Sequence, residues 1–270
     1  MHSVKDSDRC LSKLCSKRFD MPPKVRADQL LFEQGLAQSR EQARRLIMAG
    51  RAFTGAPPVR VEKPGHGYAA GTLFSLAEPE RFVSRGAYKL LTALEHFSIR
   101  TDGYVCLDAG ASTGGFTDCL LQNGAARVYA VDVGQAQLHE RLKNDARVVS
   151  LEGINLRNAP AGCIPEPVDL LVADLSFISL TLVLPNCVQW LKAGALVVAL
   201  VKPQFELSPH QVKKGVVREE TLQRAAVDKV RAFCETELGL HCLGVVPAAI
   251  RGPKGNQEYL ACFRSGAPPM

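Results

Sequence analysis

The chain has 270 residues, 46% of them hydrophobic, which is enough for a main domain with a sizeable core and a second, smaller domain. The net charge is +6 at pH 7, and the longest apolar run, residues 194–201, is far too short to span a bilayer. Residues 1–20 also lack the apolar stretch of a secretory signal, so the sequence predicts a cytoplasmic protein without a membrane segment.

The cysteine pattern supports the same compartment. There are 9 cysteines, scattered along the chain without any C-x-x-C pair. An odd number in a chain of this length argues against a disulfide scaffold, and the spacing argues against a zinc site. The sequence therefore predicts reduced thiols and no bound metal.

The excess positive charge lies in the first third of the chain. Residues 1–85 contain 15 Lys and Arg against 9 Asp and Glu, whereas residues 86–270 contain 18 of each kind. An excess confined to one segment favours an N-terminal module that binds a polyanion, with nucleic acid as the favoured partner.

Residues 1–23 are interpreted as a disordered leader, with Met21 as an alternative start. Two short helices are predicted after the leader. The first covers residues 26–34 and ends at a glycine, and the second opens with a capping box at residues 39–42 and runs to residue 49. Short strands are expected at residues 52–54, 59–61 and 72–76.

Basic side chains gather on the second of these helices. Arg40 and Arg44 are four residues apart and therefore share a face, with Arg45 beside them. Arginines on such a face bind phosphate oxygens, although an ordinary solvated face would show the same pattern. The residues predicted to bind RNA are Arg26, Arg40, Arg44, Arg45, Arg51 and Arg85.

Residues 84–270 alternate apolar runs with helical stretches, which is the pattern of an α/β domain with an open, mostly parallel sheet. Seven strands are predicted, at residues 104–107, 127–131, 147–151, 168–173, 195–201, 241–246 and 259–263. Only a short loop separates the last two, so we expect them to form a hairpin that closes the sheet edge, with the final strand antiparallel.

The first of these strands ends in Asp108 and leads into a glycine-rich turn. A strand, a tight turn and a helix in this order hold nucleotide-like ligands in α/β sheets. The spacing Asp108-x-Gly110-x-x-x-Gly114 departs from the dinucleotide G-x-G-x-x-G motif and favours S-adenosyl-L-methionine, and Asp132 at the end of the next strand can accept bonds from a ribose. The predicted cofactor contacts are Asp108, Gly110, Ala111, Ser112, Gly114, Gly115, Phe116, Asp132 and Asp174.

Ionisable residues also stand where other strands end. Asp174 follows the fourth strand, and Lys202 directly follows the fifth. If the last strand is antiparallel, Glu258 before it lies at the same edge. Lys89 lies on the helix before the first strand and faces away from its apolar side. Each has an ordinary explanation alone, such as a helix cap or a surface charge, but four at one edge favour a site.

Long motifs in this sequence resemble those of the TlyA family, also called haemolysin A proteins. The resemblance covers nearly the whole chain from Lys24. It is carried by residues 26–40, 83–90, 107–117, 132–134, 172–179 and 200–206.

The resemblance implies an RNA-binding domain of the ribosomal-protein S-four type at residues 24–80 and a linker at residues 81–83, where Phe82 replaces a frequent tryptophan. It implies an FtsJ-like 2′-O-methyltransferase domain at residues 84–270, with a Rossmann-like sheet that binds S-adenosyl-L-methionine. The family's catalytic tetrad falls on Lys89, Asp174, Lys202 and Glu258.

The implied reaction is methylation of the 2′-hydroxyl of cytidine in 16S and/or 23S rRNA, with ribosomal RNA or a ribosomal subunit as partner. A ribose hydroxyl needs a base, and we expect Lys202 to serve, with Lys89 nearby as a second cation that favours the neutral amine. Asp174 would orient Lys202, and Glu258 would position Lys89 or the ribose. The reaction requires no metal, and no obligate protein partner is indicated.

Four other functions are considered. A base-amino methyltransferase would show prolines after Asp174, where Leu175 and Ser176 stand. A cytosine-C5 methyltransferase needs a cysteine in that loop, whereas Cys187 falls later, in a predicted helix. The N-terminal module could act alone as a non-catalytic RNA-binding protein. A membrane-active haemolysin is disfavoured by the lack of a membrane segment.

Overall fold

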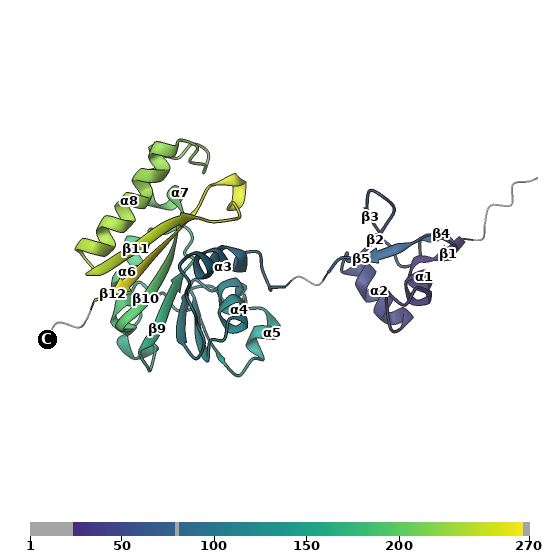
Figure 1. Ribbon diagram of the computed structural model, residues 1–270, viewed down its shortest axis with the longest axis horizontal. Coiled ribbons are helices and arrows are strands. Elements are labelled where there is room, and N and C mark those ends of the chain that lie inside the picture. Colours follow the sequence, from purple (N-terminus) through teal and green to yellow (C-terminus); the bar gives the residue numbers. More distant parts are fainter. Residues whose placement is uncertain (1–23, 79–80, 267–270) are drawn as a thin grey trace, which may run out of the picture. The chain divides into compact units, whose positions relative to one another are not determined.

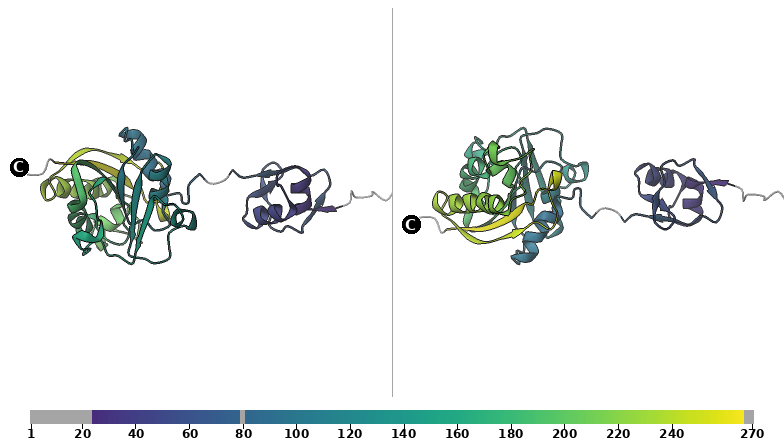
Figure 2. Two further views of the ribbon diagram at one scale, coloured as in Figure 1. Left: turned by 90° about the horizontal axis from the view of Figure 1, so that it is seen from below. Right: turned by 90° about the horizontal axis from the view of Figure 1, so that it is seen from above.

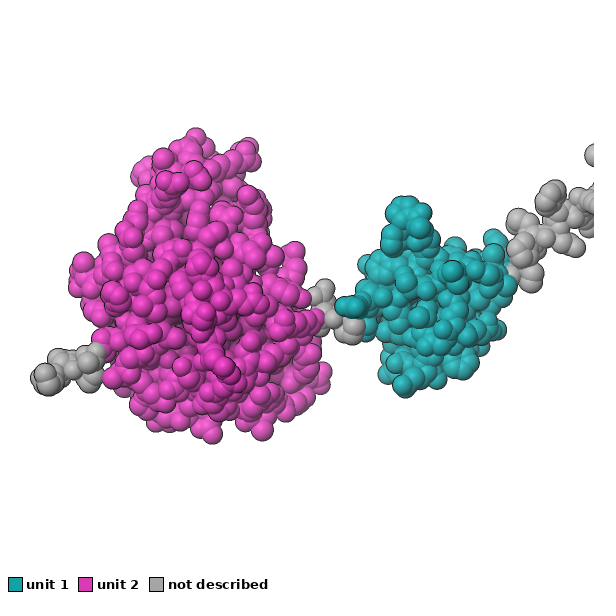
Figure 3. Space-filling model, viewed as in Figure 1, with its two compact units in different colours: residues 1–79 teal, residues 80–270 magenta. Residues whose placement is uncertain are grey.

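The computed structural model describes residues 24–78 and 81–266, which fall into two compact units, residues 1–79 and 80–270 (Figure 3). The predicted leader at residues 1–23 lies outside the described residues. Each unit has its own hydrophobic core. No helix in the described ranges is long and apolar enough to cross a membrane.

The N-terminal unit packs two short helices on two small antiparallel sheets. Its elements are β1 (Lys24–Arg26), α1 (Ala27–Glu33), α2 (Arg40–Met48), β2 (Ala52–Thr54), β3 (Val59–Arg60), β4 (Gly67–Ala69) and β5 (Phe74–Leu76). Strands β1 and β4 form one sheet, and the other has the order β3-β2-β5. The core lies between Leu31 of α1, Ile47 of α2 and Phe74 of β5. The predicted helices and three strands are confirmed, whereas β1 and β4 were not predicted.

The start of α2 shows half of the predicted capping box. Ser39 Oγ accepts a hydrogen bond from Gln42 N at 3.1 Å, as predicted. The Gln42 side chain does not return to Ser39 but accepts from Gln38 N at 2.6 Å. Both bonds still satisfy backbone N–H groups that a helix N-terminus leaves without partners.

The second unit is an α/β sandwich around one seven-stranded sheet. Its helices are α3 (Ala87–His96), α4 (Gly115–Gln122), α5 (Glu140–Lys143), α6 (Leu180–Cys187), α7 (Pro203–Glu206) and α8 (Glu220–Thr236). Its strands are β6 (Val105–Ala109), β7 (Arg127–Asp132), β8 (Val148–Glu152), β9 (Val168–Ala173), β10 (Leu191–Val201), β11 (Leu240–Pro247) and β12 (Tyr259–Ser265). Single 3₁₀ turns lie at Ala161–Cys163, Val188–Trp190, Pro209–Gln211 and Pro253–Gly255.

The strand order is β11-β12-β10-β9-β6-β7-β8. Strand β12 runs in the direction opposite to that of the other six. All seven predicted strands and the antiparallel last strand are therefore confirmed. Helices α3, α4 and α5 cover one face of the sheet, and α6 and α8 cover the other (Figures 1 and 2). Successive side chains of a strand pack into the cores on opposite faces of the sheet, as Leu170 and Leu171 of β9 do. Cys187 lies on a helix, as predicted, and is buried in the second of these cores.

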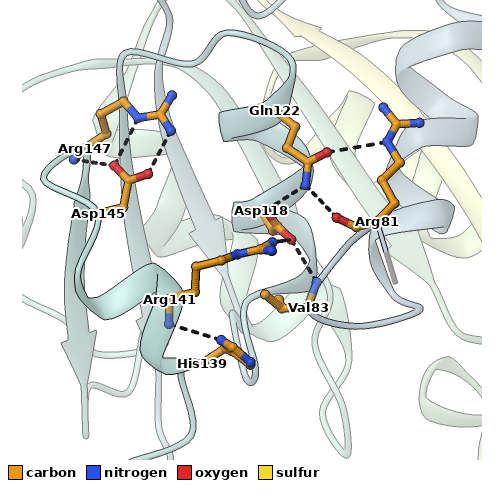
Figure 4. Close-up of polar contacts among 8 residues, drawn as sticks. All are labelled: Arg81, Val83, Asp118, Gln122, His139, Arg141, Asp145 and Arg147. Atoms are coloured by element: carbon orange, nitrogen blue, oxygen red, sulfur yellow. Dashed lines mark hydrogen bonds and ion pairs between the residues drawn. The ribbon is translucent and has the colours of Figure 1, made fainter. Parts of the chain in front are cut away.

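Residues 81–83, the expected linker, pack on the second unit against α4 (Figure 4). Val83 N donates to Asp118 Oδ2 at 2.8 Å, and Gln122 Nε2 donates to the Arg81 carbonyl at 2.9 Å. Phe82 is buried and meets the Tyr88 ring edge-on at 5.2 Å between centroids. These contacts fix where the chain enters α3, the helix that carries Lys89.

Candidate active site

Six strands of the second unit run in one direction, and β12 begins at the edge where they end. The four residues predicted to be catalytic lie at this edge as two ion pairs. Lys202 Nζ is 2.6 Å from Asp174 Oδ1, and Lys89 Nζ is 2.6 Å from Glu258 Oε2. The start of α3 lies near both pairs, because Lys89 is on this helix and a Cβ built on Gly86, its N-cap residue, would lie 4.0 Å from Asp174 Oδ2.

The Lys202–Asp174 pair is held by the segments that follow β10 and β9. The Lys202 side chain is 9% exposed, and its ammonium also donates to Ser176 Oγ at 2.7 Å. The same ammonium lies 5.9 Å from the centroid of the Phe205 ring. An ion this far from water needs such partners, and here they also fix where its nitrogen points.

The Lys89–Glu258 pair is more deeply buried. The Glu258 side chain is 0% exposed, and its carboxylate packs against the backbone of Gly252, where a side chain would collide with it. Each lysine thus has its own carboxylate partner, whereas the sequence led us to expect that the second lysine favours a neutral Lys202. Charge balance within each pair is what makes the burial of Lys89, Lys202 and Glu258 tolerable.

The glycine-rich turn packs directly against the segment that carries Asp174. Gly110 has φ +87°, and a Cβ there would meet the Asp174 carbonyl oxygen at 2.8 Å. Gly114 has φ +93° and precedes α4, and a Cβ there would collide with Leu142. Only glycine fits either position without strain or displacement. The turn therefore approaches the segment after β9 closely at Gly110, because no side chain stands between them.

Asp132 at the end of β7 braces the far side of the turn. Its Oδ2 accepts from Ser112 N at 2.8 Å, and its Oδ1 accepts from Gly134 N at 2.7 Å. A cleft of about 490 Å³ opens between this carboxylate and the segment after β9. A smaller hollow of about 170 Å³ continues from it to Lys202, past the start of α3. The two cavities share Gly110, Ser112, Asp174 and Ser176.

Asp108 lies beneath the turn rather than in either cavity. It is fully buried, and its Oδ2 accepts from Thr117 Oγ1 at 2.7 Å, while Oδ1 has no hydrogen-bond partner among the described residues. Burial raises the pKa of this carboxyl to about 7. The acidic side chains that line the cleft itself are Asp132 and Asp174, and together with the glycine turn they fit a cofactor that carries positive charge, as the sulfonium and amino groups of S-adenosylmethionine do.

Seven of the nine predicted cofactor contacts line the cavities, and Asp108 and Gly114 do not. Several side chains at the site were not predicted from the sequence. Ser176 binds Lys202, and Phe177 is 90% exposed at φ +64° with its ring 5.1 Å from that of Phe205. Their position two and three residues after Asp174 is the signal that could have found them.

Glu206 joins the two segments that carry Asp174 and Lys202. It is buried on α7, and its carboxylate accepts from Leu180 N at 2.8 Å and from the Ser179 hydroxyl. Lys229 of α8 donates to the Glu206 carbonyl at 2.6 Å. Burial raises the pKa of this carboxyl above its usual range. Glu206 thus fixes the start of α6 relative to the residues that follow β10.

The predicted RNA-binding arginines occur on both units. Asp28, which is buried, binds Arg26 at 2.7 Å and Arg40 at 3.5 Å. Arg44 lies 3.9 Å from Glu41, and Arg51 donates to the Ala77 carbonyl at 3.1 Å. Arg85 is exposed in the second unit, just before α3. Arg26, Arg40 and Arg44 remain about half exposed despite their partners.

Comparison with known proteins matches both units. The family model of FtsJ-like methyltransferases covers residues 82–265, and that of the S4 domain covers residues 25–51. The chain is 47% identical over 248 residues to the 16S/23S rRNA (cytidine-2′-O)-methyltransferase TlyA of Mycobacterium tuberculosis, covering 91% of each chain. This chain belongs to the TlyA family of FtsJ-like methyltransferases.

Other TlyA relatives carry haemolysin names. Hemolysin A of Brachyspira hyodysenteriae is 36% identical over 88% of this chain and 99% of its own. A solved structure titled a hemolysin, from Streptococcus thermophilus, has a TM-score of 0.69 and 43% identity over 92% of this chain and 90% of that chain. The fold predicted from the sequence is confirmed, and the methyl donor of this enzyme family is S-adenosylmethionine.

Replacing Gly110 by alanine is expected to damage cofactor binding and catalysis together. The added methyl group would strain the backbone at φ +87° and push the Asp174 carbonyl away. Calorimetry with S-adenosylmethionine should show weaker binding, and methyl transfer should fall further. Gly162→Ala is the control, because a Cβ there meets nothing within 4 Å. Equal cofactor affinity in Gly110→Ala and the control would contradict this account.

Asp108 should make the protein less stable as the pH rises. Its pKa is about 7 in the folded protein, against an ordinary value of 3.8. Between these two values the folded state keeps a proton that the unfolded state has already released, so the free energy of unfolding falls as the pH rises through the interval. Between pH 5 and pH 8 the loss is about 3 kcal/mol. Urea unfolding at both pH values should show this loss in the wild type and a smaller one in Asp108→Asn. Parallel pH profiles would refute the assignment.

Proposed function

We propose that this protein transfers a methyl group from S-adenosylmethionine to the 2′-hydroxyl of a cytidine in 16S and/or 23S rRNA, in the cytoplasm. The observation that carries the proposal is the small hollow that joins the glycine turn to Lys202, Asp174 and Ser176. A hydroxyl placed there would lie between a lysine nitrogen and the edge of the cofactor cleft. Seven described cysteines are free thiols, in keeping with a reducing compartment.

In this proposal Lys202 is the base that accepts the proton of the ribose hydroxyl. A hydroxyl is a weak nucleophile at neutral pH, and a lysine serves as base only while its amine is neutral. The Lys202 ammonium must therefore first release its proton to solvent. The neutral amine, held by Asp174 and Ser176 at 2.6 Å and 2.7 Å, then accepts the hydroxyl proton, and the Asp174 carboxylate balances the ammonium charge that forms again. The bound cofactor supplies the electrophilic methyl carbon. Alignment of oxygen, carbon and sulfur then contributes much of the rate.

Lys89 and Glu258 have a positioning role in this scheme. Lys89 is held by the fully buried Glu258, so its nitrogen is fixed at the first turns of α3. A cation there can hold the ribose or its phosphate while Lys202 takes the proton. The S4 domain, with its exposed arginines on α2, would supply affinity for RNA away from the reacting group.

Lys202→Arg is expected to lower methylation by about 10²- to 10⁴-fold, because the charge is kept while an arginine cannot act as a base. The measurement is transfer of labelled methyl groups to 16S and 23S rRNA, followed by mapping of 2′-O-methyl cytidines. Lys192→Ala is the control, since Lys192 lies at the opposite end of β10, paired with Asp169 at 2.7 Å. No 2′-O-methyl cytidine with the wild type would refute the function, and wild-type rates for Lys202→Arg would refute the base.

Arginines of α2 are expected to set part of the salt dependence of RNA binding. Combined Arg44→Ala and Arg45→Ala should reduce the slope of log affinity against log salt by roughly two units, about 0.9 for each phosphate that is no longer neutralised. The substitutions to lysine, which keep the charge, should retain most of the slope. A slope unchanged in the alanine variant would show that this face is simply solvated.

A further inference from the structure

Two loops of the methyltransferase unit are fastened together at the edge that carries the catalytic pairs. One connects α7 to α8, and the other connects β11 to β12. Asn256, which is buried, donates from Nδ2 to the Gly215 carbonyl at 2.9 Å and accepts from Val217 N at 3.0 Å through Oδ1. Gln223 of α8 also donates to the Val217 carbonyl at 2.9 Å. The two loops therefore form one braced surface.

This braced surface is strongly basic. Residues 208–218 and 249–257 contain five Lys and Arg and no Asp or Glu. All five are exposed, and we call them the basic edge: Lys213, Lys214, Arg218, Arg251 and Lys254. Lys254 lies across the neighbouring loop, since its Nζ would be 3.3 Å from a Cβ on Gly215. Among the described residues, one of these five forms an ion pair, Lys213 with Glu219 at 3.7 Å. That pair is weak, because its side chains are 86% and 61% exposed.

The basic edge adjoins the catalytic pairs through the chain itself. Glu258 directly follows the second loop, and its carboxylate packs on Gly252 within that loop. Lys89, the partner of Glu258, is one helical turn beyond the exposed Arg85. None of the exposed large apolar side chains among the described residues lies in either loop, so the surface lacks the apolar anchors of a protein-binding site.

We propose that the basic edge is an RNA-backbone-binding surface that holds phosphates flanking the target nucleotide. This inference rests on the proposed function and extends it from the S4 domain to the methyltransferase unit. Lysines and arginines on a braced backbone offer phosphate oxygens charge-assisted bonds, which position a nucleic acid without reading its sequence. Because Asn256 fixes the loops beforehand, little order must be created when RNA binds.

The test replaces Lys213, Lys214 and Lys254 by alanine together in the full chain. With transcribed 16S or 23S rRNA as the probe, the slope of log affinity against log salt should shrink by roughly two to three units, at about 0.7 to 0.9 for each phosphate. The KM for RNA should rise, while the affinity for S-adenosylmethionine stays unchanged. The same three positions changed to arginine should behave as the wild type.

The matched control removes three cations from the opposite edge of the sheet. Arg100→Ala, Lys192→Ala and Arg264→Ala combined change the net charge equally. Lys192 and Arg264 lie at the far ends of β10 and β12, and Arg100 precedes β6. This control should keep both the salt slope and the KM for RNA. A slope and KM in the basic-edge variant equal to those of the control would overturn the proposal. So would a lower kcat at unchanged KM, which would mean that the loops only hold Glu258.

The two proposals fail in different ways. If the wild type produces no 2′-O-methyl cytidine, the proposed function fails, but the salt slope of RNA binding still measures the basic edge. If the wild type methylates RNA and the basic-edge variant binds it with an unchanged slope, only the basic edge fails. Failure of the arginine variant to restore binding would also contradict it, because positive charge is the property that the proposal requires.

Discussion

The contact of Gly110 with the Asp174 backbone is the constraint on which the site depends. The glycine turn that lines the cleft and the segment after β9 touch there, with no room for a Cβ between them. The same segment presents the Asp174 carboxylate and Ser176 to Lys202. A methyl donor and a hydroxyl acceptor must approach within bonding distance, and a site built on two touching backbone segments meets that demand with little adjustment. Glu206 then holds the segment from the other side, through the start of α6.

Burial of charge at this edge has an energetic consequence. Removing an ion from water costs several kcal/mol, and an unpaired buried partner costs about 3–5 kcal/mol when its counter-ion is deleted. The Lys89–Glu258 pair, with Glu258 fully buried, is therefore a weak source of stability but a strict constraint on geometry. Asp108 illustrates the alternative solution. Its hydrogen-bond partner is the Thr117 hydroxyl rather than a cation, and burial raises its pKa to about 7.

Much of this architecture could be predicted from sequence, because the relevant signals are local. Seven apolar runs mark seven strands, and the residues that end them, such as Asp174 and Lys202, fall at one edge once the sheet is parallel. What could not be predicted depends on contacts distant in sequence. The pairing of each lysine with its own carboxylate depends on the position of α3 beside β12, 169 residues apart at Lys89 and Glu258. The packing of residues 81–83 depends on Asp118 and Gln122 of α4. Strands β1 and β4 pair with each other across the two helices and two strands that separate them in the sequence, and no local pattern shows that contact.

The charge distribution shows how a composition can conceal a binding surface. Residues 86–270 contain equal numbers of acidic and basic residues, which taken alone would assign RNA binding to the N-terminal unit. The fold, however, places the five lysines and arginines of the basic edge together beside Glu258, so a unit without net charge is locally basic at the candidate active site. Affinity held by the N-terminal unit raises the local concentration of RNA but cannot orient one ribose, because orientation requires contacts close to the reacting oxygen. An enzyme with two RNA-binding parts would thus recruit RNA with one and orient the target ribose with the other. Only the contacts that orient the ribose must lie close to Lys202.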